Sequence, residues 1–228
     1  MRQIVFDTET TGLDPAKGHR IVEIGCVEVM DRSITDNYFH VYINPDRDID
    51  PGALSVHGLT VDFLSDKPIF KSIVSSFIEF IRDAELIAHN ASFDVKFIDS
   101  ELNMAGMGPL ISYCSGVVDS LDQARKLRPG KRNSLDALCD FYNISNKDRV
   151  LHGALLDARL LANVWLSMTR GQDELIINNK SNSYSGKNLR DNRFYLNLPV
   201  LKATTEEQKE HDNYIEDLQK IDKKVTWP

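Results

Sequence analysis

The first 43 residues have the apolar spacing and the turn signals of three successive strands. Residues 4–6 form a short apolar run, and acids with the turn residues Thr11 and Gly12 follow it. Residues 21–30 and 38–43 are rich in β-branched and aromatic side chains, with Asn and Asp between the two segments. Such segments are typical of strands. Because the connections are short, we expect an antiparallel meander.

The period then becomes helical. The apolar positions 70, 73, 74, 77, 78 and 81 follow the i, i+3, i+4, i+7 spacing of a helix with one buried face. We also predict strands at residues 86–88 and 117–118 and a helical pattern that contains residues 93, 97 and 102. Ser134 is a suitable cap for the next helix, and a last helix covers residues 154–169. This order of elements predicts an α/β fold, a mixed sheet with helices packed on it.

The composition changes after Gly171. Residues 178–188 contain four Asn and three Ser, a composition that cannot bury a core. We therefore predict a globular domain over residues 1–170, a flexible linker over 171–198 and a short docking tail over 199–228. Thr205 to Gln208 match a capping box at the start of a helix in that tail. The apolar residues further along predict that the tail binds a partner protein.

Length, charge and cysteine content exclude several classes of protein. The 228 residues, of which 42% are hydrophobic, suffice for one domain and a smaller part. The net charge of −7 argues against binding of nucleic acid by bulk charge alone, although it permits binding through metal ions. Three cysteines without a CxxC pair argue against a disulfide framework and a structural zinc. The acids near the start and the lack of a long apolar stretch predict a cytoplasmic protein without a membrane span.

Four carboxylates occur where other residues are expected. Asp7 and Glu9 lie two apart at the end of the first strand and so share one face, although a simple turn would also use such residues. Asp157 shares a helical stripe with apolar residues, and Asp94 has Phe97 at i+3. Each of these two acids alone would suit a helix cap or dipole partner. Together with the strand pair, they predict a convergent cluster, because buried carboxylates need a counter-charge.

Carboxylates without cysteines or paired histidines favour hard divalent ions such as Mg²⁺ or Mn²⁺. Two such ions about 3.5–4 Å apart can activate a water and stabilise the leaving oxygen of a phosphodiester. His152, just before Asp157, is a candidate general base, and a cap or surface histidine is the alternative. The sequence has no P-loop, dinucleotide-binding or serine-hydrolase motif.

Three segments together resemble the motifs of the DEDDh exonuclease superfamily: residues 6–12 (FDTETTG), 89–94 (HNASFD) and 152–158 (HGALLDA). The resemblance implies a ribonuclease H-like fold and removal of nucleoside 5′-monophosphates from the 3′ end of DNA or RNA. It also implies two Mg²⁺ or Mn²⁺ ions per site. Asp7 would bridge the two ions, Glu9 and Asp157 would bind the tighter one, and Asp94 the other. His152 would be the general base.

Residues 56–60 (VHGLT) and the tail resemble more closely the proofreading (epsilon) subunits of bacterial DNA polymerase III. This resemblance implies a site for the 3′ end of frayed or single-stranded DNA. Its substrate-binding residues would be Asp7, Thr8, Glu9, Thr10, Thr11, His57, Asn90, Phe93 and Asp157. His57 also suits a plain turn before Gly58. Gly52 departs from the family, which often has a carboxylate there that contacts the substrate.

The same resemblance implies protein partners. The tail would bind the polymerase alpha subunit, and its apolar anchors would be Tyr214, Ile215, Leu218 and Trp227. Gln172, Leu175 and Ile177 form a degenerate sliding-clamp motif that lacks an aromatic residue. A small accessory subunit is a further candidate partner. Two alternatives remain: a free-standing exonuclease that trims RNA or repairs DNA, and a mainly structural replicase scaffold with a vestigial site.

Overall fold

The computed structural model describes residues 1–147, 149, 151–170 and 203–221. The chain divides into two units, Met1–Ile177 and Asn178–Pro228, and each is described by itself. The predicted linker and its clamp motif (Gln172, Leu175, Ile177) lie outside the described residues, as does Trp227. The division of the chain into domain, linker and tail therefore stays a prediction.

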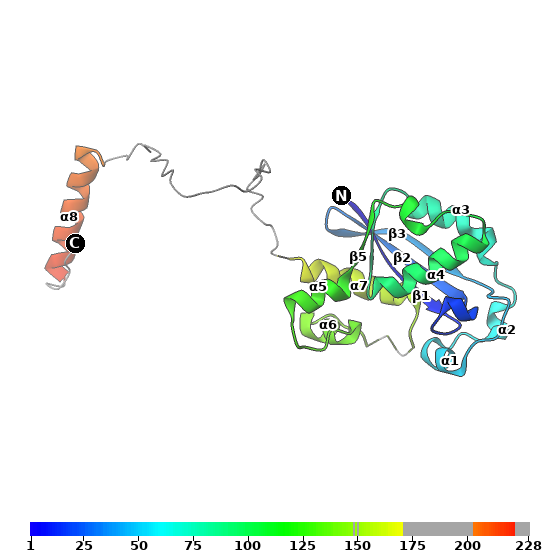
Figure 1. The fold of residues 1–228 in the computed structure, drawn as a ribbon. Coiled ribbons are helices and arrows are strands. Elements are labelled where there is room, and N and C mark those ends of the chain that lie inside the picture. The colour runs from blue at the N-terminus through cyan, green and yellow to red at the C-terminus, as the bar shows by residue number, and fades with distance from the viewer. Residues whose placement is uncertain (148, 150, 171–202, 222–228) are drawn as a thin grey trace, which may run out of the picture. The chain divides into compact units, whose positions relative to one another are not determined.

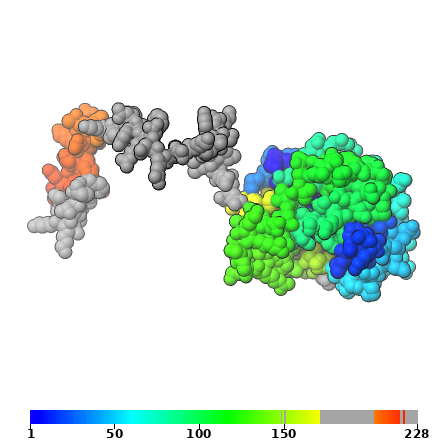
Figure 2. Space-filling view, viewed as in Figure 1, coloured from blue at the N-terminus to red at the C-terminus, as the bar shows by residue number. Residues whose placement is uncertain are grey.

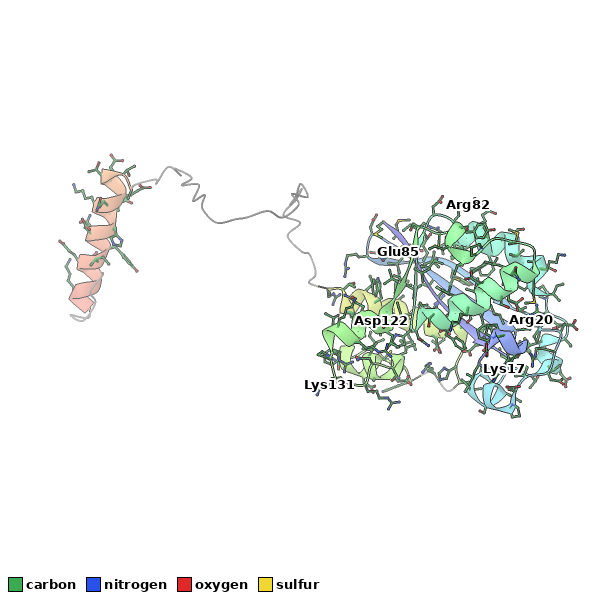
Figure 3. The ribbon with its side chains drawn as sticks, in the orientation of Figure 1. Lys17, Arg20, Arg82, Glu85, Asp122 and Lys131 are labelled. Atoms are coloured by element: carbon green, nitrogen blue, oxygen red, sulfur yellow. The ribbon has the colours of Figure 1, made fainter. Side chains whose placement is uncertain are left out.

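The first unit is built on a five-stranded mixed sheet with the order β3-β2-β1-β4-β5 (Figure 1). Strands β1 (Arg2–Thr10), β2 (Ile21–Met30) and β3 (Ser33–Tyr42) form the antiparallel meander expected from the sequence. Strands β4 (Glu85–Ala88) and β5 (Gly116–Asp119) are parallel to β1. Glu85, at the start of β4, lies at the opposite end of the sheet from Lys17 and Arg20, which follow β1 (Figure 3). The mixed sheet confirms the predicted fold class.

Helices cover both faces of this sheet. Helices α3 (Phe70–Ile81) and α4 (Ala91–Met104) pack with Ile4 and Phe6 of β1. Helices α5 (Ser120–Leu127), α6 (Leu135–Tyr142) and α7 (Ala154–Met168) pack with Val5 on the other face. Side chains alternate along a strand, so Asp7 and Glu9 share the face of Val5 and point toward the side of α7. Thr8 shares the face of Phe6, on the side of α4.

Strand β1 continues through both acids to Thr10, which agrees with the strand pair and excludes the alternative of a simple turn at Asp7 and Glu9. Three helices were not predicted: α1 (Pro51–His57), α2 (Val61–Leu64) and α5. Each is short and buries only one or two side chains, so the sequence shows no apolar period there. Two 3₁₀ helices, η1 (Pro15–Lys17) and η2 (Leu110–Ser112), were missed for the same reason.

The second unit contains helix α8 (Thr205–Ile221). Its capping box lies one residue earlier than predicted: the Glu207 amide donates to the Thr204 hydroxyl, and Glu207 Oε2 accepts from the Thr204 amide. The earlier threonine caps because Thr205 is already helical. On this helix Tyr214 is exposed and Ile215 is half-buried, while the Leu218 side chain lies outside the described part. Within the described ranges, no helix combines the length and the apolar character needed to cross a membrane.

Candidate active site

The four carboxylates predicted from the sequence line one cavity of about 280 Å³. Asp7 and Glu9 come from the end of β1, while Asp94 and Asp157 come from the first turns of α4 and α7. These elements meet because the carboxyl ends of β1 and β4 lie at one edge of the sheet, where chains that leave parallel strands converge. His152 lines the same cavity. Oxygen or nitrogen atoms of Glu9, His152 and Asp157 lie within 4.8 Å of one another.

Gly25 allows α7 to approach the sheet closely enough to bring Asp157 to this cavity. Gly25 pairs with Asp7 across β1 and β2, and the first turn of α7 lies directly on it. A β-carbon at Gly25 would lie 2.2 Å from the Leu155 backbone nitrogen, far inside van der Waals contact. Asp157 follows two residues later. The missing side chain of one glycine therefore sets the distance between the strand acids and the helix acid.

The carboxylates of the cluster repel one another in a poorly solvated place. Burial, together with the charge of Asp157, raises the pKa of Glu9 from 4.5 to about 8. Burial and the charges of Asp94 and Glu9 raise the pKa of Asp7 well above its usual value. Burial also raises the pKa of Asp94, against the opposing effect of its Thr8 hydrogen bond. The Thr8 hydroxyl donates to Asp94 Oδ1 at 2.6 Å. A cluster that resists full ionisation is the kind of donor set that divalent cations stabilise.

The sequence did not point to Arg149, which lies inside this cavity. Its Nε and Nη2 donate to the two oxygens of Asp157 at 2.5 and 2.6 Å. Nη1 donates to Asp136 at 2.7 Å, and Nη2 lies 2.8 Å from His152 Nδ1. No spacing rule singles out an arginine in a loop before a helix, so only the fold shows this bridge.

A second cavity of about 550 Å³ adjoins the carboxylates, with Thr8, Glu9 and Phe93 lining both. The walls of this second cavity, the apolar cavity, include Thr10, Leu13 and His57. On the surface, the loop after β1 lies between α4 on one side and α1 and α2 on the other (Figure 2). The Leu59 amide donates to His57 Nδ1 at 3.0 Å, so Nε2 carries the proton and donates to the Thr10 carbonyl at 3.3 Å. Burial lowers the pKa of His57. This neutral histidine fixes α1 against the end of β1.

The remaining predicted residues have defined positions. Thr11 is fully buried beneath the loop, where its hydroxyl accepts from the Arg20 amide. Asn90 precedes α4 in a left-handed conformation and lines the carboxylate cavity. The backbone N–H of Asn90 donates to the carboxylate of Asp119 at the end of β5. The sequence did not point to Asp119. Gly52 lines the apolar cavity, in which a carboxylate at this position would project from the first turn of α1.

The fold and this cluster are those of a nuclease, and comparison with known proteins agrees. The exonuclease family RNase_T matches residues 4–165. Exonuclease X, solved in complex with 5′ overhanging duplex DNA, has 29% identity and a TM-score of 0.58 over 73% of this chain and 90% of its own. The nuclease domain of 3′hExo, a DEDDh family member bound to rAMP, has the same fold, with a TM-score of 0.63, 16% identity, and coverage of 73% and 90%.

Curated relatives define the family more narrowly. DNA polymerase III subunit epsilon of Escherichia coli (strain K12) is 46% identical over 99% of this chain and 97% of its own length. The subunit of the same name from Salmonella typhimurium is 54% identical over 76% of this chain and 74% of its own length. The chain belongs to the family of DNA polymerase III epsilon subunits and is a 3′–5′ exonuclease.

Proposed function

We propose that the chain removes mispaired 3′-terminal nucleotides from DNA as the proofreading subunit of a replicative polymerase, and that its four clustered carboxylates hold two divalent ions. The observation that carries this proposal is the convergence of Asp7, Glu9, Asp94 and Asp157 on one cavity. Mg²⁺ or Mn²⁺ would supply charge stabilisation and a more acidic bound water. Oxygen-only donors fit these hard ions better than zinc.

The carboxylates would divide the two ions according to their positions. The charges of Asp94, Glu9 and Asp157 all raise the pKa of Asp7, which supports a place for Asp7 near each of them, and Asp7 would contact both ions. Glu9 and Asp157 lie close enough to share one ion. Asp94, on the α4 side and oriented by the Thr8 hydroxyl, would hold the other.

His152 is placed to accept the proton of the attacking water. It is partly exposed and lies at the mouth of the cavity, with Nδ1 3.4 Å from Asp157 Oδ2. Its backbone amide donates to the Val56 carbonyl at 3.1 Å, which ties its loop to α1. An imidazole in this position is a suitable general base.

The apolar cavity would take the terminal nucleoside. Phe93 lies at the junction of the two cavities, so a base beside it would place the last phosphodiester over the carboxylates. Thr10 and His57 form the wall near the sugar, and Thr11 supports that wall from below. A mismatched end costs less to unpair than a matched one, so the DNA itself supplies much of the selectivity.

The proposal that this chain binds a polymerase rests on its relatives, which are named as subunits of DNA polymerase III. We infer that the tail binds the polymerase alpha subunit, with Tyr214, Ile215, Leu218 and Trp227 as anchors. An exposed Tyr214 on a helix supports a docking role. Contacts of Gln172, Leu175 and Ile177 with a sliding clamp, and a small accessory subunit, are further proposals.

Two substitutions test the catalytic assignment. Asp7→Asn and Asp157→Asn should reduce the release of deoxynucleoside 5′-monophosphates from 5′-labelled DNA by at least about 100-fold, since positioning and metal charge are both lost. Asp122→Asn, in an exposed pair with Arg125, is the matched control and should keep full activity. Asp7→Asn should not lower the thermal midpoint, because it removes a repelled carboxylate. An active Asp7→Asn or Asp157→Asn enzyme would refute the assignment.

A further inference from the structure

Arg149 is the charged group of the site for which the exonuclease reaction has no evident use. Its side chain is only 8% exposed, and the Asp157 side chain is 3% exposed. The guanidinium binds both carboxylate oxygens of Asp157 in bidentate geometry, the strongest form of this ion pair. A buried arginine therefore neutralises the helix acid that the proposed function gives to a metal ion.

The two cations need the same oxygens. Mg²⁺ binds a carboxylate oxygen at about 2.0–2.1 Å, whereas Arg149 nitrogens lie 2.5 and 2.6 Å from the two oxygens of Asp157. Two positive charges so close, in a poorly solvated cavity, repel each other strongly. Either the ion or the guanidinium can hold Asp157 in this geometry.

Arg149 also engages the candidate base. A guanidinium has only donors, so His152 Nδ1 must accept from Nη2 in the 2.8 Å contact. The Nδ1 lone pair is thus occupied, and the neutral ring carries its proton on Nε2. The 3.4 Å approach of Nδ1 to Asp157 is then not an ion pair. One side chain holds both the metal-binding acid and the acceptor nitrogen of the base.

A third contact, with Asp136, can hold Arg149 after it dissociates from Asp157. Nη1 donates to Asp136 at 2.7 Å, and the Asp136 side chain is half exposed at the entrance of the cavity. Asp136 is also held by the Asn146 side-chain amide. The guanidinium can therefore move from the buried acid to the outer one without losing all of its counter-charge.

We infer that Arg149 is a positioning residue that competes with the divalent ion for Asp157, so that metal binding releases both Asp157 and His152 from one arginine bridge. This inference rests on the proposed function for the metal ions. The bridge offsets the charge of Asp157 and occupies Nδ1 of His152 until an ion binds. Arg149 then stays on the half-exposed Asp136.

Isothermal titration calorimetry of the full-length chain with Mn²⁺ tests the bridge without an activity assay. Arg149→Gln should bind Mn²⁺ roughly tenfold more tightly than the wild type, because the competing charge is gone. Arg149→Lys should fall between the two, since lysine keeps the charge and loses the fork. Arg125→Gln, which removes an exposed arginine of a surface pair, is the matched control and should bind like the wild type.

The sign of the change separates this role from a structural one. If Arg149 merely orients Asp157, Arg149→Gln binds Mn²⁺ equally or more weakly, and the inference is overturned while the metal site stands. If none of the proteins binds Mn²⁺, the metal site itself is refuted and the bridge with it. A thermal scan in EDTA adds a second readout: Arg149→Gln should melt below the wild type, and Mn²⁺ should raise its midpoint more.

Discussion

Gly25→Ala is the substitution that tests most strictly how the fold builds the site. The new β-carbon would lie 2.2–2.4 Å from the backbone of Ala154 and Leu155, while ordinary contact begins at 3.4 Å. The first turn of α7 must therefore retreat by about 3.4 − 2.2 = 1.2 Å, because backbone atoms cannot rotate away. Asp157 lies on that turn and moves with it.

The expected losses follow from this displacement. Misplacement of a catalytic group by about 1 Å costs on the order of 100-fold in rate, and overpacking a close contact costs about 1–3 kcal/mol of unfolding free energy. Gly25→Ala should thus stay folded at low temperature but cleave about 100-fold more slowly. Single-turnover degradation of a 5′-labelled oligonucleotide, below the thermal midpoint of the variant, separates the two effects.

Gly116→Ala is the matched control, since within the described part of the chain no heavy atom lies within 4 Å of its new β-carbon. It should leave rate and stability within experimental error of the wild type. A Gly25→Ala enzyme with the wild-type rate would refute the claim that this contact sets the position of Asp157. An unchanged midpoint would refute the packing argument as well.

Three further outcomes are expected. The pKa of Glu9 is about 8 in the folded protein, above its ordinary 4.5, so the folded state binds more protons than the unfolded state between these pH values. The free energy of unfolding in EDTA should therefore fall as the pH rises through this range. Thermal scans across the range check the sign, and Mn²⁺ should raise the midpoint most at the alkaline end. Thr8→Val removes the donor to Asp94, so the exonuclease rate at low Mn²⁺ should drop about tenfold and recover at high Mn²⁺; a deficit that excess metal cannot repair would contradict this role. Gly52→Glu places a carboxylate in the first turn of α1, where space is open among the described residues. It should raise the free energy of unfolding by about 0.5–1 kcal/mol and lower the KM for DNA. An unchanged KM would show that the position does not contact substrate.

The sequence predicted those parts of the fold whose residues bury an apolar stripe. Helix α3 begins and ends where its i, i+3, i+4 spacing does, and β2 covers its β-branched run. Strands β1 and β3 extend beyond the runs predicted at residues 4–6 and 38–43, because their added residues are largely polar. Helix α1 escaped prediction because His57 is its only buried side chain among the described residues, although Pro51 and Gly58 are ordinary start and stop signals. Helix α5 buries only Ser120 and Ala124 within that part of the chain.

The carboxylate cluster was predictable for a similar reason. Asp94 and Asp157 interrupt apolar faces, and an acid on such a face needs a partner that the sequence can signal but not identify. Arg149 and Gly25 could not be found in this way. Gly25 acts through a contact with α7, far along the chain. Arg149 acts on residues nearby in sequence, but it lies outside the helices and breaks no periodic pattern.

An anomalous-scattering map of a crystal grown with Mn²⁺ and a deoxynucleoside 5′-monophosphate would show whether the four carboxylates hold the metal. We expect two manganese peaks about 3.5–4 Å apart, one beside Glu9 and Asp157 and one beside Asp94, with Asp7 between them. The nucleoside should lie against Phe93. A map without manganese among these four carboxylates, from crystals that bind the metal elsewhere, would refute the two-metal site.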